Sequence, residues 1–397
     1  MQFGLKLGSR EINYTKEINS LFKDGYFHYI ELFAVLGSFN ETIDYWKQFS
    51  IPIIIHAPHS LSGMNLSLSE ERENNKKKLN ETFNFADALN SEYIIFNAGI
   101  NGKIEETINQ LLPFADKRCL IENKPAKGLN GEKCLGTTAD EIKYIQKELK
   151  IGFCLDFGHA ICSANTNKIN PHEFINGLML LNPSMYHLSD GIYLNEIDSH
   201  LHFGKGTFPL MDFFNLIPEG AKVSNEAAQK NNLNDFITDS LYFMSSRYLR
   251  RADISDMENI YEWANDADTR KNSFNQTPIP FDVHKKWFEN KINSDSVLFY
   301  IYQCGKEKFG QARFDIEGDT ATISCTINPL YRGKGYGYKI LLLAEDKIIR
   351  EFKQINNFHA EVKNDNIACL KMMKKLNYDE SQEEGYVKLF KKINRHT

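Results

Sequence analysis

Five short apolar runs of this chain end in residues that commonly bind metal ions, and this recurrence constrains the fold more than any other feature. The runs are IPIIIHAPH, CLIENKP, GFCLDFGHA, MYHLSDG and AKVSNEA. A short, continuous apolar run is typical of a strand that is buried on both faces. Histidines and carboxylates stand at or near the C-terminal ends of these expected strands: His56, Glu122, Asp156, His159, His187 and Glu226.

Strand-like runs alternate with helix-like stretches through about residue 245, and this alternation predicts a (β/α)8 barrel of parallel strands. Amphipathic segments such as ADEIKYIQKEL separate the runs. In such a barrel the C-terminal ends of all strands meet on one face, so ligands that are far apart in the sequence converge in one pocket. The expected strands lie near residues 2–7, 27–34, 52–57, 93–98, 119–123, 152–157, 185–189 and 221–226.

A length of 397 residues suits two domains rather than one, and the alternating pattern breaks near SSRYLRRADISDM. We therefore expect domains at 1–245 and 246–397. Residues 1–246 contain 22 Lys and Arg against 30 Asp and Glu, whereas residues 247–397 contain 25 against 22. Because a protein that grips DNA neutralises phosphates with basic side chains, the acidic first part argues against a nucleic-acid partner. The mildly basic second part suits a phosphorylated small molecule.

We expect a soluble, cytoplasmic enzyme without a membrane partner. No run of 18 apolar residues exists, and MQFGLKLGSR lacks the apolar core of a signal peptide. The seven cysteines are dispersed and contain no CxxC pair, which indicates reduced thiols rather than disulfides or a zinc knuckle.

The ligand set suits a divalent ion, for which zinc or manganese is the expected identity. Glu122, Asp156, His187 and Glu226 come from four strands and can form one closed set of ligands. His159 lies three residues after Asp156 and can face a neighbouring ion, and Asp198 with His200 forms another two-ligand unit. A single histidine at a strand end is more often structural, and we interpret His59 and His202 in that way.

At these residues the chain resembles the xylose isomerase-like barrel superfamily, specifically its endonuclease IV-like branch, over about residues 1–245. The motifs that carry the resemblance are IHAPHSL, IENKP, CLDFGHA, HLSDG, DSHLHFGKG and SNEA. It implies one ion held by the four-ligand set and another held by His159, Asp198 and His200. His56 would belong to a third position, whose second histidine is replaced by Asn97 in YIIFNAGI.

Two mechanisms fit this pocket. In epimerase or isomerase members, one ion polarises sugar oxygens while carboxylates move a proton, a catalytic role that we assign to Glu122 and Glu226. In nuclease members, several ions activate water and stabilise a leaving phosphate oxygen. Asp198 and His200 favour a multi-ion site, whereas Asn97 and the acidic composition argue against DNA. A small phosphorylated or nucleotide-linked sugar fits both observations.

The second strong motif is ATISCTINPLYRGKGYG, in which an apolar strand ending near Ile327 leads into a glycine-rich loop and then into a helix. Glycines let backbone N–H groups approach a pyrophosphate, and the helix N-terminus adds its positive dipole end. A simple turn is the alternative reading of such a short motif. The residues expected to contact the cofactor are Ile327, Arg332, Gly333, Lys334, Gly335, Tyr336, Gly337 and Asn366.

This motif and the downstream FHAEVKNDNIACLKMMKKLNYDE resemble the GNAT superfamily of N-acetyltransferases over about residues 247–394. The resemblance implies a mixed, mostly antiparallel sheet, acetyl-CoA as the cofactor, and Asn366 as a cofactor contact. It also places Met373 where many relatives carry a tyrosine acid. His284 is either a catalytic base or a structural residue beside Trp287.

The segment LRRADISDMENIYEWANDADTRKNSF is most similar to acetyltransferases of nucleotide-linked amino sugars, although ribosomal-protein acetyltransferases share part of the pattern. The similarity implies an acceptor site at Asn265, Asp266 and Arg270, whereas Asn265 and Asp266 can equally cap or end a helix. Overall the sequence predicts a bifunctional amino-sugar enzyme with a metal-dependent sugar epimerase or isomerase barrel. The alternatives for the barrel are a phosphoester hydrolase and a non-catalytic binding scaffold.

Overall fold

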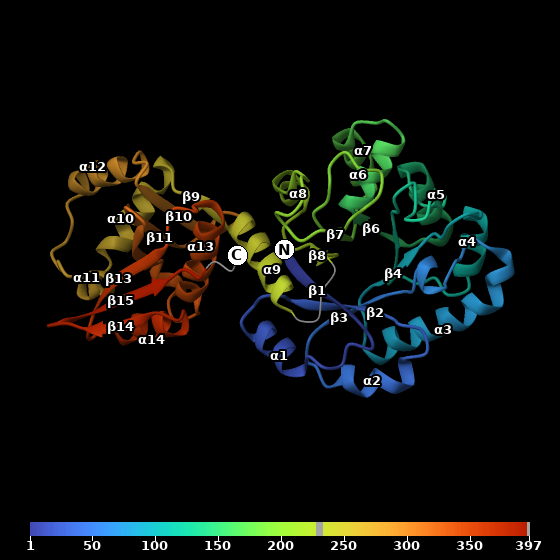
Figure 1. Cartoon of the computed structure of the whole chain (residues 1–397), viewed down its shortest axis with the longest axis horizontal. Coiled ribbons are helices and arrows are strands. Elements are labelled where there is room, and N and C mark those ends of the chain that lie inside the picture. Colours follow the sequence, from blue (N-terminus) through green and yellow to red (C-terminus); the bar gives the residue numbers. More distant parts are fainter. Residues whose placement is uncertain (228–232, 395–397) are drawn as a thin grey trace. The chain divides into compact units, whose positions relative to one another are not determined.

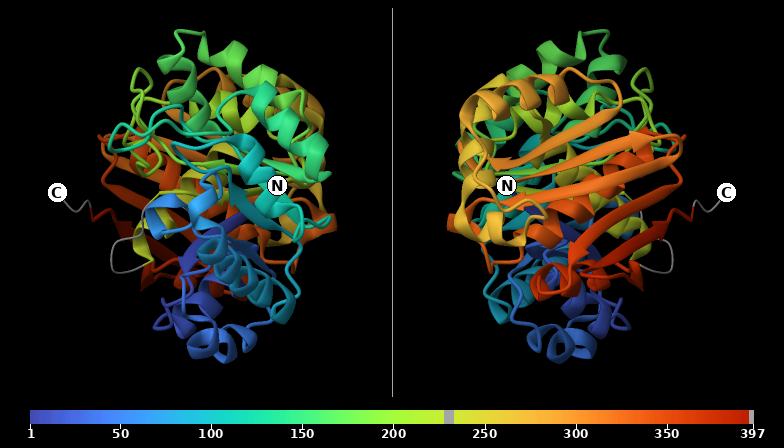
Figure 2. Two further views of the ribbon diagram at one scale, coloured as in Figure 1. Left: turned by 90° about the vertical axis from the view of Figure 1, so that its right-hand side faces the viewer. Right: turned by 90° about the vertical axis from the view of Figure 1, so that its left-hand side faces the viewer.

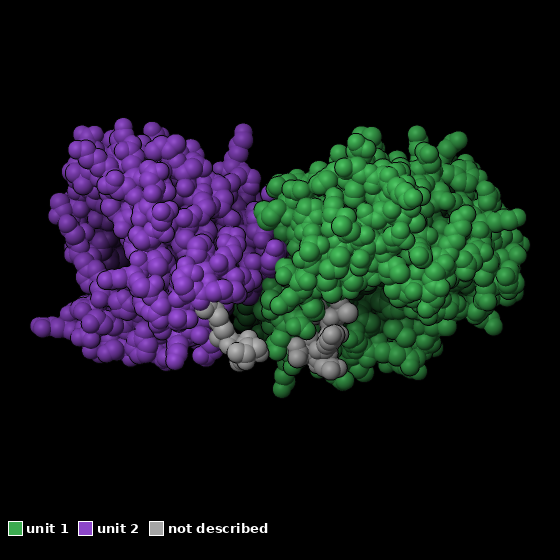
Figure 3. Space-filling view, turned by 45° about the horizontal axis from the view of Figure 1, so that its top comes forward, with its two compact units in different colours: residues 1–240 green, residues 241–397 purple. Residues whose placement is uncertain are grey.

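The computed structural model describes residues 1–227 and 233–394 of the chain. Its contacts divide the chain into two compact units, Met1–Ser240 and Leu241–Thr397, which Figure 3 draws in two colours. The division falls inside one helix, α9 (Asn234–Tyr248), as does the boundary at 245/246 expected from the sequence. Within the described part of the chain, no helix combines the length and apolar character needed to cross a membrane.

The first unit is a closed barrel of eight parallel strands in sequential order, as the alternating pattern predicts (Figure 1). The barrel closes where β1 pairs with both β2 and β8. The strands are β1 (Gln2–Gly8), β2 (Tyr29–Phe33), β3 (Ile53–His56), β4 (Ile94–Asn97), β5 (Cys119–Glu122), β6 (Gly152–Asp156), β7 (Met185–Leu188) and β8 (Lys222–Asn225).

Amphipathic helices surround these strands. In α5, for example, Ile142, Ile145 and Leu149 are buried along one face, and the Thr138 side chain accepts a hydrogen bond from the N–H of Glu141 at the N-cap. Besides α9, the helices are α1 (Thr15–Lys23), α2 (Phe39–Lys47), η1 (Ser60–Ser62), η2 (Ser69–Glu71), α3 (Arg72–Ala88), α4 (Ile104–Leu111), α5 (Ala139–Leu149), α6 (Phe157–Thr166), α7 (Pro171–Met179) and α8 (Leu210–Leu216).

An apolar layer fills the barrel and supports the polar residues at the strand ends. Six consecutive strands each contribute one buried residue to it: Tyr29, Ile54, Ile95, Leu120, Cys154 and Met185. The Tyr29 hydroxyl lies 3.0 Å from Ser224 Oγ of β8. Gly4 makes this possible, because a Cβ there would lie 2.4 Å from the Tyr29 ring. The barrel is therefore a packed core with its polar chemistry confined to one end.

The second unit is built on a seven-stranded sheet in the order β14-β15-β13-β12-β11-β10-β9, whose strands run side by side in the right-hand view of Figure 2. Among the described pairs of this sheet, only β12–β13 is parallel. The strands are β9 (Leu249–Arg251), β10 (Val297–Cys304), β11 (Glu307–Glu317), β12 (Thr320–Ile327), β13 (Asn357–Lys363), β14 (Asp379–Gln382) and β15 (Tyr386–Lys392).

Helices pack against this sheet through apolar and aromatic side chains. One core cluster joins Ile260, Trp263 and Phe288 of the helices to Val297, Phe299 and Ile301 of β10. The helices are η3 (Ile254–Asp256), α10 (Met257–Asn265), α11 (Ala267–Asn272), α12 (Phe281–Ile292), η4 (Pro329–Tyr331), α13 (Tyr336–Glu351) and α14 (Ile367–Lys375). The mixed, mostly antiparallel sheet agrees with the fold implied by the sequence resemblance.

Candidate active sites

Four strand ends of the barrel bring one set of metal-type ligands together. Glu122 ends β5, Asp156 ends β6, His187 lies in β7, and Glu226 follows β8 directly. Each residue offers one ligand atom, and these atoms all lie within 4.8 Å of one another. Three carboxylates and one imidazole that are buried this closely suit a divalent cation, because carboxylates without a counter-charge are expensive to bury. The donor set therefore fits the ion that the sequence implies.

A second group joins His159, Asp198 and His200, whose ligand atoms also lie within 4.8 Å of one another. Asp198 Oδ2 and His200 Nδ1 are buried and have no hydrogen-bond partner among the described residues. Gly158 provides the space, because a Cβ there would lie 2.3 Å from Asp198 Oδ2. Unpartnered buried polar atoms need an explanation, and a second cation at this group would supply one.

The loop that carries Asp198 and His200 is bonded at four backbone N–H groups by a buried carboxylate, Asp190. Its Oδ1 accepts hydrogen bonds from the N–H groups of Gly191 and Phe208, and its Oδ2 accepts them from Gly204 and Gly206. The side chain is 1% exposed. Asp190 is thus the carboxylate with the most backbone bonds to this loop, and the Asp190–Leu201 backbone pair and the hydrogen bond from the N–H of Phe203 to Asp239 add to its hold.

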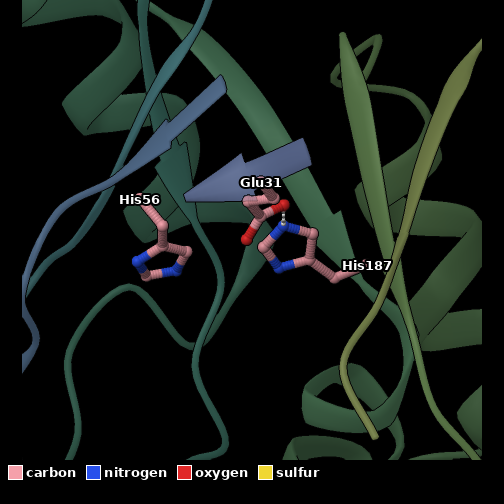
Figure 4. A group of neighbouring side chains, drawn as sticks. All are labelled: Glu31, His56 and His187. Carbon is pink, nitrogen blue, oxygen red and sulfur yellow. Dashed lines mark hydrogen bonds and ion pairs between the residues drawn. The ribbon is translucent and has the colours of Figure 1, made fainter. Parts of the chain in front are cut away.

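His56, expected at a third metal position, lies at the end of β3 with Nε2 3.3 Å from Glu122 Oε2. Asn97 donates a hydrogen bond from Nδ2 to the same oxygen of Glu122, so it occupies a place beside this carboxylate but offers no imidazole. His56 also belongs to a third group of neighbouring donors with Glu31 and His187, which Figure 4 draws.

Sequence reasoning missed Lys6 and Glu31. Glu31 lies on β2, is 0% exposed, and has Oε2 2.9 Å from His187 Nε2. Lys6 lies on β1 with Nζ 2.5 Å from Glu226 Oε1 and 3.2 Å from Glu31 Oε1. The available signal was a charged residue within each of two apolar strands, GLKLG and YIELF, where a solvent-exposed side chain is not expected.

The pKa shifts of the three carboxyl groups among the four ligands divide them into two classes. Burial raises the pKa of Asp156 well above its ordinary value, and the nearby Asp198 adds to this effect. Burial opposes ionisation at Glu122 and Glu226 as well, but the pKa of Glu122 is lowered by hydrogen bonds with His187 and His56. The pKa of Glu226 is lowered by Lys6 and His187. Two carboxylates are therefore anionic without any ion, and Asp156 is the carboxyl group that would release a proton on ion binding.

A cavity of about 330 Å³ opens beside these residues, a size suited to a small sugar. Besides proposed ligands it is lined by Lys6, His59, Lys124 and Phe33. His59, interpreted from the sequence as structural, therefore lines the cavity, with its ring centroid 5.4 Å from that of Phe33. His202, interpreted in the same way, has Nδ1 2.8 Å from Asp239 Oδ2.

In the second unit, the glycine-rich motif forms the loop between β12 and α13. Gly333 and Gly335 have φ of +73° and +82°, a left-handed conformation that glycine adopts without strain. Gly335 is the N-cap of α13, whose first N–H groups have no partner within the helix. These groups and the helix dipole suit a pyrophosphate.

Side chains of the loop pack on the neighbouring strand. Tyr336 stacks on Phe309 with ring centroids 4.5 Å apart, and Lys334 lies over the Tyr331 ring at 5.3 Å. Gly337 begins α13 together with Tyr336. Aromatic and cation–π contacts thus help to hold the loop, together with the ion pair between Arg332 and Asp266.

The strand before the loop separates from its parallel neighbour. β12 pairs with β13 only from Thr320 to Thr322, so the half that ends at Ile327 faces β13 without ladder hydrogen bonds among the described residues. Such free backbone groups can pair with an extended ligand. Asn366 is the N-cap of α14, and its side chain accepts a hydrogen bond from the N–H of Cys369 at 3.2 Å.

The three residues expected at an acceptor site hold the backbone around α11. Asn265 exchanges hydrogen bonds with both backbone groups of Ile279. Asp266 caps α11, and Arg270 Nε donates to the carbonyl of Ala264. Asp266 also lies 2.5 Å from Arg332 of the glycine-rich loop, so the structure links this segment to the expected cofactor loop.

His284 lies in an aromatic cluster and is 1% exposed. Its ring lies 5.3 Å from those of Tyr261 and Trp287. Burial lowers its pKa, and Nε2 has no hydrogen-bond partner among the described residues. These surroundings are compatible with the structural role that the sequence left open, and a catalytic role stays a prediction. Met373, at the place of the tyrosine acid of many relatives, is buried on α14.

Two family models match the chain in succession. A model described as "Xylose isomerase-like TIM barrel" matches residues 36–227, and a model described as "Acetyltransferase (GNAT) domain" matches residues 247–379. No curated protein matches. Solved structures with similarity include a D-tagatose 3-epimerase-like protein, 18% identical, covering 62% of this chain and 97% of its own with a TM-score of 0.47. Spermidine N-acetyltransferase from Vibrio cholerae is 16% identical and covers 36% of this chain and 94% of its own with a TM-score of 0.34. The chain thus joins a xylose isomerase-like TIM barrel to a C-terminal GNAT acetyltransferase domain.

Proposed function

We propose that this chain is a bifunctional enzyme of amino-sugar metabolism, in which the barrel is a divalent-metal-dependent sugar epimerase or isomerase and the second unit transfers acetyl groups to a nucleotide-linked amino sugar. The observation that carries the barrel proposal is the convergence of Glu122, Asp156, His187 and Glu226 within 4.8 Å at one end of the strands. A divalent ion held there would polarise the carbonyl and hydroxyl oxygens of a sugar.

The residues of the barrel would then bind the sugar and move its protons. Epimerisation or isomerisation requires a base that removes a proton next to the polarised carbonyl. Glu122 and Glu226 are the candidates, because their lowered pKa values keep them as carboxylates. Lys124 and His59 line the cavity and would contact the rest of the substrate.

The second unit would bind acetyl-CoA through the loop from Arg332 to Gly337 and through the unpaired half of β12. The left-handed glycines and the N-terminus of α13 support this assignment. Amine acetylation needs a neutral amine and a proton for the leaving thiolate. Met373 carries no ionisable group, which excludes its side chain as that acid.

A phosphoester hydrolase is a second candidate for the barrel, favoured by the group of His159, Asp198 and His200. Metal analysis of the purified protein, compared with an Asp198→Ala/His200→Ala double variant, separates the candidates. One ion that survives the substitutions supports epimerase or isomerase chemistry. Two or more ions, reduced by one in the variant, favour hydrolysis. A barrel that binds no ion would be left as a scaffold.

The acetyltransferase proposal is tested by the release of free CoA thiol from acetyl-CoA with nucleotide-linked amino sugars as acceptors. Peptides with free N-terminal amines serve as competing acceptors, because part of the sequence pattern is shared with ribosomal-protein acetyltransferases. Acetylation of peptides alone would contradict the amino-sugar assignment while leaving acetyl transfer intact.

A further inference from the structure

Four charged or polar side chains form a closed ring at the seam of the barrel. Lys6 Nζ lies 3.2 Å from Glu31 Oε1, and Glu31 Oε2 lies 2.9 Å from His187 Nε2. His187 Nδ1 lies 2.7 Å from Glu226 Oε1, and the same oxygen lies 2.5 Å from Lys6 Nζ. His187, Lys6 and Glu31 lie on β7, β1 and β2, and Glu226 directly follows β8, so the ring spans the place where the barrel closes.

The ring is buried, so its charges must balance within it. Glu31 and His187 are fully buried, and the side chains of Lys6 and Glu226 are 22% and 10% exposed. Lys6 and Glu31 are also register partners across β1 and β2, which places both side chains on the same side of the sheet. Lys6 is thus a single cation shared by two buried carboxylates, Glu31 and Glu226. Burial opposes a charge on His187, but Cys154 and these two carboxylates raise its pKa well above the ordinary value, so in the absence of an ion His187 supplies the second positive charge.

The ring also determines which nitrogen of His187 is available to an ion. In Figure 4 a dashed line joins Glu31 to the His187 ring, whereas His56 has no such contact with either residue. An imidazole that binds an ion is neutral and has one lone pair, and the Glu31 carboxylate at Nε2 of His187 favours the remaining proton on that nitrogen. The Nδ1 atom then faces Glu122 and Glu226, so His187 serves the four-ligand group rather than the group with Glu31 and His56.

We propose that Lys6 is a built-in competitor of the divalent ion, which occupies an oxygen of Glu226 and thereby weakens metal binding at the four-ligand group. This inference rests on the proposed metal dependence of the barrel. An ammonium group and a dication that are attracted to the same carboxylate repel each other strongly in a buried site. The consequence is a lower affinity of the four-ligand group, so that its ion exchanges with ions in solution.

The test is the affinity of the full chain, freed of metal, for Zn²⁺ and Mn²⁺ measured by competition with a chromophoric chelator. Lys6→Met removes the charge, and we expect it to tighten binding by at least about tenfold. Lys6→Arg keeps the charge and should bind the ions much like the unmodified chain. Lys124→Met is the matched control, because Lys124 lines the same cavity and acts on Glu122 through its charge, but pairs with no carboxylate of the four-ligand group within the described part of the chain.

Each outcome of the affinity measurement either supports or overturns the competition between Lys6 and the ion. Tighter binding by Lys6→Met, with a much smaller change in Lys124→Met, supports the competition. Unchanged or weaker ion binding by Lys6→Met overturns the competition, and so does an equal effect of the two substitutions. Neither result contradicts the metal dependence of the barrel. If neither the unmodified chain nor Lys6→Met binds either ion, the metal dependence itself is refuted. Should Lys6→Met fail to fold, Lys6→Gln, which retains a hydrogen-bond donor without the charge, takes its place with the same criteria.

Discussion

Replacing Asp190 by asparagine should release the loop that carries Asp198 and His200. The carboxylate accepts four backbone N–H groups, two at each oxygen. An amide keeps one oxygen, so two of these hydrogen bonds are lost and two N–H groups face the donors of the new NH₂ group. The side chain is 1% exposed, so water cannot replace the lost acceptor without opening the loop.

The size of the effect follows from these contacts. A hydrogen bond to a charged group contributes about 1.5–3 kcal/mol, so the loss of two predicts at least about 3 kcal/mol for the closed loop. The loop can relieve this cost by opening locally, so the effect should be concentrated there and not in the whole barrel. A change of 3 kcal/mol corresponds to opening that is roughly a hundredfold more frequent.

Hydrogen–deuterium exchange measures this opening, because the amides of Gly191, Gly204, Gly206 and Phe208 are the bonded donors. We expect their exchange to accelerate by about a hundredfold in Asp190→Asn, together with loss of any ion that depends on His200. Asp212→Asn is the control, because that carboxylate is 56% exposed on α8 of the same unit. Exchange rates for 190–208 that match those of the unmodified chain would refute the anchoring role of Asp190.

Three further predictions follow from other parts of the chain. Gly335→Ala places a Cβ at φ of +82°, which costs about 1 kcal/mol or more and should weaken acetyl-CoA binding in calorimetry; unchanged affinity would argue against the loop as the binding site. Asp256 is fully buried between Arg250 and Lys308, so Asp256→Asn should lower the free energy of unfolding of the second unit by about 3 kcal/mol in urea. A decrease below about 1 kcal/mol would contradict this. Burial opposes ionisation of Asp256, but its basic partners lower its pKa below 3.8, so the stabilisation is full above pH 3.8 and is lost as pH falls through the lowered pKa. Chelation of divalent ions should abolish the sugar reaction of the barrel and leave acetyl transfer unchanged. Loss of both activities on chelation would contradict the proposal that only the barrel needs the ion.

The strands and their polar ends could be predicted because each signal is local. A short apolar run such as GFCLD is typical of a buried strand, and Asp156 at its end is conspicuous because an unpaired carboxylate is costly to bury. The parallel order of the strands then requires their C-terminal ends to share one face. The glycine-rich loop is local as well, because Gly333 and Gly335 satisfy a backbone requirement that no neighbour can change.

Contacts between distant segments could not be read in this way. The sequence allowed Asn265 and Asp266 to line an acceptor site or to cap or end a helix. It could not show that Asp266 pairs with Arg332, 66 positions later, or that Asn265 bonds with Ile279. The partners of polar side chains in loops depend on which segments lie close together in space. A single sequence does not contain these distances.

The sequence by itself determined the alternating barrel, the places of Glu122, Asp156, His187 and Glu226 at its strand ends, and the glycine-rich loop after β12. The tertiary structure alone decided that Lys6 is a partner of Glu226 and Glu31. These residues are brought together by closure of β8 against β1 and by the register of β1 with β2. Closure is a property of the whole barrel, because the first strand meets the last only after all eight have twisted into place.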